Sequence, residues 1–218
     1  MSANYNASAI GVPYVRGTQV IINYPDSVGG TPVATVTQST AIIMADGSIR
    51  NLDAINTIFI PLDFVNNGNT PIPMVDPTSG AALGTNTTLN TIYLQVLAIV
   101  RQIQVASNSA GTNYAASAVG VPYVRGVQLV INWPDALGGL PSATISQSNA
   151  VLLADGTVRN LDPLPPITTV LDFANSGSVP IPLVNPSTGA ALGPTTNLNT
   201  IYENVLALVR QAQVGSGQ

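Results

Sequence analysis

Short runs of apolar and β-branched residues, separated by turn residues, occupy roughly the first 75 positions of the chain. Gln19 to Asn23 forms such a run and is followed by Tyr-Pro-Asp and Gly-Gly, which is typical of a strand that ends in a turn. Ala34 to Met44 predicts one longer strand or two, and Thr57 to Val65 predicts a further strand. Pro71-Ile72-Pro73 suits only an edge strand or an extended arm, because proline cannot donate to a β-ladder. This pattern predicts a mainly β fold.

A hairpin turn is predicted between Met44 and Ile49. Asp46-Gly47 lies between the apolar run that ends at Met44 and the next apolar residue, Ile49. Asp-Gly favours a type I′ turn, in which both central residues need a positive φ.

The pattern changes from period two to a helical period near residue 89. Apolar residues then recur three and four positions apart: Leu89, Ile92, Tyr93, Val96, Leu97, Val100 and Ile103. This spacing predicts an amphipathic helix, with Thr87 or Thr88 as its N-cap and Arg101 near its C-terminus, where the helix dipole favours a cation. The apolar stripe is expected to pack on the sheet of its own domain; the alternative is that part of it meets another subunit.

The chain contains an internal repeat. Residues 4 to 105 align with residues 113 to 214 at a constant offset of 109 without a gap, and 62 of the 102 pairs are identical. A period above 100 residues is too long for a solenoid unit, so each copy is expected to close its own core. The sequence therefore predicts two tandem domains, 1–107 and 108–218, each a small β-sandwich or barrel with one C-terminal α-helix. Ala106 to Thr112 has the small polar composition of a flexible linker.

Composition excludes several classes of function. Charged residues make up 7% of the chain, against roughly 25% in ordinary domains. Cys, His and Lys are absent, which rules out disulfides, thiolate zinc sites, His-dependent triads and the P-loop lysine. A net charge of -4 with only six Arg gives no basic surface for nucleic acid.

No membrane partner is expected either. The longest apolar-rich stretch, Leu89 to Val105, is interrupted by polar residues, whereas a spanning helix needs about 20 nearly continuous apolar residues. Met1 to Pro13 lacks the basic and apolar regions of a secretory signal, so none is expected.

The few charged residues are mostly retained between the copies. Asp26, Asp46, Asp53 and Asp63 recur as Asp135, Asp155, Asp162 and Asp172, and Arg16, Arg50 and Arg101 recur as Arg125, Arg159 and Arg210. We expect turn roles for these acids and Arg–Asp pairs that fix a strand junction. The alternative, a glycosidase-like carboxylate pair that includes Asp63 and Asp172, needs two acids on either side of a sugar. No catalytic, cofactor-binding or metal-binding residue is predicted.

Tyr24 and its counterpart Trp133 allow two interpretations. Either aromatic side chain could stack on a sugar, but an aromatic residue before Pro at a strand end is more often part of the core.

The segment Pro77 to Gly84, followed by Leu89-Asn90-Thr91-Ile92-Tyr93 and repeated from Pro186 and Leu198, resembles small virion proteins of tailed bacteriophages. The resemblance is one of overall composition and segment pattern over the whole chain. It assigns no functional residue to this sequence. It implies a non-enzymatic structural subunit located in the virion, most readily a capsid decoration or cement protein. The expected partners are further copies of the chain and other virion proteins such as a major capsid protein. The alternatives are a tail-attached fibre or adaptor protein, or a carbohydrate-binding adhesin module.

Overall fold

The computed structural model describes residues 9–27, 29–75, 81–107, 112–116, 118–185 and 190–215. Most of the expected linker and the starts of the two repeated Pro-to-Gly segments, residues 77–80 and 186–189, lie outside the described residues. The first copy contains β1 (Tyr14–Asn23), β2 (Val33–Ile43), β3 (Ile49–Pro61), α1 (Phe64–Asn67), β4 (Pro71–Val75), β5 (Ala82–Thr88) and α2 (Leu89–Ser107). The second contains β6 (Pro122–Asn132), β7 (Ser142–Leu152), β8 (Val158–Val170), α3 (Phe173–Ser176), β9 (Ile181–Val184), β10 (Ala191–Thr196) and α4 (Leu198–Gly215).

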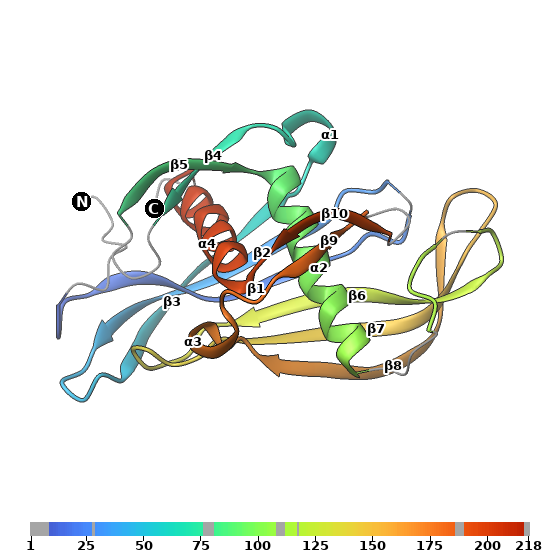
Figure 1. Ribbon diagram of the computed structural model, residues 1–218. Helices are drawn as coiled ribbons and strands as arrows, with labels where there is room; N and C mark the ends of the chain where they lie inside the picture. Colours follow the sequence, from blue (N-terminus) through green and yellow to red (C-terminus); the bar gives the residue numbers. More distant parts are fainter. Residues whose placement is uncertain are drawn as a thin grey trace.

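One antiparallel sheet runs through both copies. Its strand order is β3-β2-β1-β6-β7-β8, so the first strand of each copy lies at the centre and the third lies at an edge. β1 and β6 pair with Ile21 opposite Val130, which are equivalent positions of the two copies. The sheet therefore has an approximate two-fold relation between the copies. Two small sheets, β4-β5 and β9-β10, complete the described strands (Figure 1).

The long helix of each copy crosses to the strands of the other copy. Helix α2 contacts β8 and β9 in addition to β5, and α4 contacts β3 and β4 (Figure 1). Two glycines of the sheet repeat this exchange: a Cβ built on Gly126 of β6 would lie 3.1 Å from Val100 of α2, and one built on Gly17 of β1 would lie 3.3 Å from Val209 of α4. The helical stripe is buried, but the prediction that it packs on the sheet of its own domain is wrong, because the strands it contacts come largely from the other copy.

A single main hydrophobic cluster contains side chains of both copies. The sheet contributes one face of alternating residues, and the helices contribute most of their circumference. The strand residues are Val20, Ile22, Ala34, Val36, Leu129, Ile131, Ala143 and Ile145. The helix residues include Ile92, Val96, Ile99, Val100, Ile201, Val205, Leu208 and Val209. Leu97, which the periodicity also assigned to the stripe, and the equivalent Leu206 of the second copy are only half-buried.

The mainly β fold with a helix at the end of each copy is confirmed. A sandwich or barrel within each copy is not confirmed, since the described strands form the shared sheet and two small ones. Separate folding of residues 1–107 and 108–218 stays a prediction.

The Asp46 hairpin forms, but its turn is not type I′. Gly47 has a φ of 82°, whereas no described non-glycine residue has a positive φ. The amide of Gly47 donates to the carbonyl of Met44, and the amide of Met44 donates to the carbonyl of Ser48. Asp46 instead accepts from the amide and hydroxyl of Ser48, which favours a conventional turn with Gly47 at the left-handed position.

Two other predicted boundaries differ. The strand expected over Thr57 to Val65 ends at Pro61, because the Asp63 carboxylate accepts from the amides of Val65 and Asn66 and starts α1. Strand β5 was not predicted at all. The Pro71–Pro73 segment does form a strand, β4, in one of the two-stranded sheets, and Thr88 caps α2 by accepting from the amide of Thr91.

The helix exchange predicts a specific energetic coupling. Gly126→Ala is expected to destabilise the fold by roughly 1 to 3 kcal/mol, because the added methyl group meets Val100 in a close-packed core. Val100→Ala should relieve this contact, so a double-mutant cycle in urea unfolding should give a coupling above about 0.5 kcal/mol.

Val209→Ala is the matched control, since Val209 is as buried as Val100 but lies over Gly17. Its effect should add to that of Gly126→Ala. Coupling of Gly126 to Val209 instead of Val100 would show that each helix lies over its own copy.

Candidate functional site at the junction of the two copies

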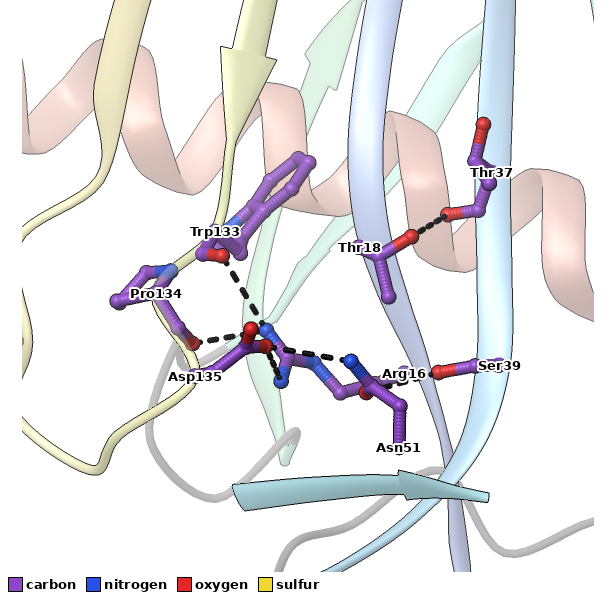
Figure 2. A network of polar contacts seen from close by, with 8 residues as sticks. All are labelled: Arg16, Thr18, Thr37, Ser39, Asn51, Trp133, Pro134 and Asp135. Carbon is purple, nitrogen blue, oxygen red and sulfur yellow. Dashed lines mark hydrogen bonds and ion pairs between the residues drawn. The ribbon is translucent and has the colours of Figure 1, made fainter. Parts of the chain in front are cut away.

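Arg16 of β1 is buried against the loop that follows β6. Its Nη1 donates to Oδ1 of Asp135 at 2.9 Å, and its Nη2 donates to the carbonyls of Pro134 at 2.8 Å and Trp133 at 3.4 Å (Figure 2). The arginine side chain is 8% exposed, whereas that of Asp135 is 66% exposed. The guanidinium thus joins a strand of the first copy to a loop of the second.

The same loop is held by the β2-β3 hairpin of the first copy. The Asn51 amide donates to Oδ1 of Asp135 at 3.3 Å, and Ser39 donates to Oδ1 of Asn51 at 3.0 Å (Figure 2). The backbone amide of Ile49 also donates to the carbonyl of Asp135 at 2.8 Å. Side chains and backbone therefore fix this loop together.

The reciprocal cluster forms around Arg125 of β6. Its guanidinium pairs with Asp26 and donates to Oδ1 of Asn160 at 3.0 Å, to the carbonyl of Tyr24 at 2.9 Å and to that of Pro25. The hydrogen bond from Arg125 holds the pKa of Asp26 below its usual value. The expected Arg–Asp pairing therefore occurs, and both described ion pairs run between the copies.

Buried amides add a second set of contacts between the copies. Gln104 of α2 donates to Gln147 of β7, and Gln213 of α4 donates to Gln38 of β2. Asn204 of α4 donates to its equivalent residue on α2, Gln95. Sequence reasoning missed these contacts. The signal was present, because Gln38 and Gln104 recur as Gln147 and Gln213 within apolar segments.

The remaining retained acids lie in local structures. Asp46 and Asp155 accept hydrogen bonds within their hairpin turns, and Asp63 and Asp172 cap the short helices α1 and α3. These bonds hold the pKa of each of the four carboxyls below its usual value. Asp53 and Asp162 lie exposed on the edge strands β3 and β8. Within the described ranges, no three His, Cys, Asp or Glu side chains gather as metal ligands.

Tyr24 and Trp133 both pack against the main cluster, which favours the core interpretation of these aromatic residues. Trp133 donates through Nε1 to the hydroxyl of Tyr202 at 3.2 Å, whereas the buried hydroxyl of Tyr24 has no hydrogen-bond partner. Tyr24 also lines a cavity of about 330 Å³, together with Tyr93 and Arg101 of α2 and Arg125 of β6. A pocket of this size is large enough for a small molecule.

Comparison of the chain with protein-family models, with curated proteins and with solved structures found no match. Among the described helices, none combines the length and the apolar character needed to cross a membrane. Function is therefore argued from the geometry of the junction and of the surface.

Replacing Arg16 tests the junction. Arg16→Ala should destabilise the fold by roughly 1 to 3 kcal/mol, because two carbonyls lose the guanidinium donor and the carboxylate of Asp135 loses its ion pair. Arg16→Lys should recover only part of this, since one ammonium lacks the planar fork of a guanidinium. Arg50→Ala, an exposed change in β3, should stay within about 0.5 kcal/mol of wild type in the same urea titration. Equal effects of Arg16→Ala and Arg50→Ala would contradict the structural role of the cluster.

The pKa shifts predict how stability depends on pH. Carboxyls with a lowered folded-state pKa stabilise the fold above their unfolded value near 3.8, and this contribution is lost as the pH falls through the folded value. Burial raises the pKa of Tyr14, Tyr93 and Tyr123, so their contribution is present below 10.0 and is lost at higher pH. The chain has no His. Melting temperature should therefore be nearly constant from about pH 5 to 9 and fall outside that window. A marked transition between pH 6 and 7 would contradict this reading.

Proposed function

We propose that the protein is a non-enzymatic structural subunit of a virion, of the capsid decoration or cement type. The observation that carries the proposal is the scarcity of charge in the central strands of the sheet, whose face turned away from α2 and α4 we call the open face (Figure 1). The four central strands, β1, β2, β6 and β7, contain only two charged residues, Arg16 and Arg125, and both are buried and paired. Protein interfaces are depleted of charge at their centres, so such a face suits contact with other subunits.

Uncharged side chains cover the open face along its central seam. Ile21 lies opposite Val130, and it alternates with Val20 and Ile22, which point into the core. On either side of this pair, Gln19 donates to Asn132 at 2.7 Å and Gln128 donates to Asn23 at 2.8 Å. The side-chain amides of each pair bond to each other across the β1-β6 seam. This lowers the desolvation cost when another subunit covers the open face.

Exposed apolar residues recur at equivalent positions of the two copies, although surface positions are the most tolerant of exchange. Ile10 is 65% exposed and its counterpart Val119 is 59% exposed, and Val12 and Val121 are each 43% exposed. The further exposed pairs are Met44 with Leu153, Leu52 with Leu161, Leu83 with Leu192, and Val105 with Val214. One chain thus presents similar apolar positions twice, which suits a subunit that meets quasi-equivalent neighbours.

The segments 54–61 and 163–170, which differ at all aligned positions except Ile58 and Ile167, lie at the two edges of the sheet. Residues 54–61 belong to β3 and residues 163–170 belong to β8. Pro163, Pro165 and Pro166 remove backbone donors from β8, whereas β3 has Ala54, Asn56 and Thr57 at these positions. The two edges therefore offer different hydrogen bonds, which fits different neighbours in an assembly. Within a virion, a chain whose described helices form no long coiled coil suits a lattice position better than a fibre shaft.

Placing charge on the open face should block assembly while the fold persists. Thr35→Lys with Thr144→Lys adds one charge to each copy at equivalent, partly exposed positions of β2 and β7. We expect wild type to self-associate in light scattering at high concentration and the double variant to stay monomeric. Its melting temperature should remain close to that of wild type.

The matched control is Val65→Lys with Ala174→Lys, which adds the same charge at equivalent exposed positions of α1 and α3. It should associate like wild type. Cryo-EM and mass spectrometry of purified virus particles should find the chain in the particle. A chain that stays monomeric at millimolar concentration and is missing from those particles would refute the proposal.

A further inference from the structure

Polar contacts between the two copies recur in both directions. A residue of the first copy that bonds to the second has a counterpart of the same type, 109 positions later, that makes the same bond back to the first. These contacts are Arg16–Asp135 with Arg125–Asp26, Asn51–Asp135 with Asn160–Asp26, and Gln104–Gln147 with Gln213–Gln38. Each copy therefore carries both halves of the interface. Such an interface is isologous, so its natural partner is a second copy of the same surface.

The register of the β1-β6 seam has the same symmetry. Ile21 lies opposite Val130, which is its own equivalent in the second copy. Two positions to either side, hydrogen-bonded Gln–Asn pairs cross the seam: Gln19 with Asn132, and Gln128 with Asn23. The seam is thus centred on one position, and the residues on either side of it exchange places between the copies. A copy that belongs to a different chain would meet the same partners across the seam.

The covalent connection between the copies is short. The carbonyl of Tyr114 accepts from Arg101 at 3.0 Å, and the hydroxyl of Tyr114 donates to the carbonyl of Gln104 at 3.1 Å, so the chain turns back along α2. Asn113 bonds to the start of β6. Only residues 108–111 lie between the end of α2 and this anchored segment. A short connection gives the second copy an effective concentration of about 1 mM at the first copy, and this favours pairing within one chain.

We infer that the seam of each copy is a binding surface for a second copy of this chain, and that chains which fold at high concentration exchange their copies through it. In the exchanged dimer, β1 of one chain pairs with β6 of the other, and each long helix lies on strands of the other chain. The ion pairs, the buried amide pairs and the seam register are all retained, so the short connection is what favours the monomer. The inference goes beyond the proposed function, because the exchange needs neither a virion nor the open face.

Refolding of the intact chain at two concentrations tests the inference. Urea-unfolded protein that is refolded at about 1 mM should yield a fraction of dimer, whereas refolding at about 1 μM should yield monomer. The dimer should persist after dilution to about 1 μM, because its copies can part only by unfolding. Size exclusion with light scattering measures both samples. Association through the open face would instead reverse on dilution. A dimer that dissociates at once on dilution, or no dimer at the high concentration, would overturn the inference.

Engineered disulfides locate the exchange, and the chain has no native Cys to interfere. Ile21→Cys with Val130→Cys joins opposite residues across the seam, where antiparallel pairs lie about 4.5 to 5.5 Å apart, within the reach of a disulfide. Once this bond has formed in the monomer, refolding at about 1 mM should give no dimer, and reduction should restore the dimer. The matched control, Thr35→Cys with Phe59→Cys, joins opposite residues within the first copy and should leave the dimer fraction unchanged. Equal dimer fractions from the two oxidised variants would contradict exchange at the seam.

A deletion variant should move the exchange to low concentration. Without residues 108–111, Ser107 is joined to Thr112, and too few residues remain for Tyr114 to lie beside Gln104 of the same chain. Tyr114 should then lie beside α2 of a second chain, and the variant should be dimeric even after refolding at about 1 μM. A monomeric variant with the melting temperature of wild type would count against the exchange. If the deletion prevents folding, the refolding of the intact chain still decides.

Discussion

The antiparallel pairing of β1 with β6 is the contact on which the rest of the structure depends. It places equivalent residues such as Ile21 and Val130 opposite each other and brings the two copies into one sheet. Once the sheet is continuous, a helix attached to one copy can reach the strands of the other. The two arginine clusters and the buried amide pairs then follow as reciprocal contacts, because each copy supplies both the donor side chain and the accepting loop.

Almost every buried polar group at the junction of the two copies has a hydrogen-bond partner. Arg16 and Arg125 are nearly enclosed, and each meets one carboxylate and backbone carbonyls that belong to the other copy. Four buried atoms depart from this rule among the described residues: the hydroxyl oxygens of Tyr24, Thr87 and Thr196 and the side-chain oxygen of Asn204.

The sequence predicted local structure better than the relation between the copies. Periodicity placed the strands and the long helices, and the retained Asp and Arg residues predicted ion pairs. The sequence could not show that Arg16 pairs with Asp135 instead of Asp26, because each acid follows a Pro in an equivalent turn of its own copy. For the same reason, the sequence could not predict that each long helix packs on the strands of the other copy. The two copies share most residues, so their strands present nearly identical surfaces to either helix. Strand β5 was missed because its Gly, Thr and Asn content is typical of a loop.

The exchange of helices also constrains the order of events during synthesis. Arg16 meets its partner more than 100 positions later in the chain, and Gln38 bonds to Gln213 close to the C-terminal end. A ribosome-bound first copy therefore has its strands before it has the helix that covers them. Contacts of such long sequence separation slow folding and leave apolar surface uncovered in the meantime. Until α4 is synthesised, the strands that it covers expose apolar surface. Because the central strands carry little charge, the risk of aggregation is highest during this interval.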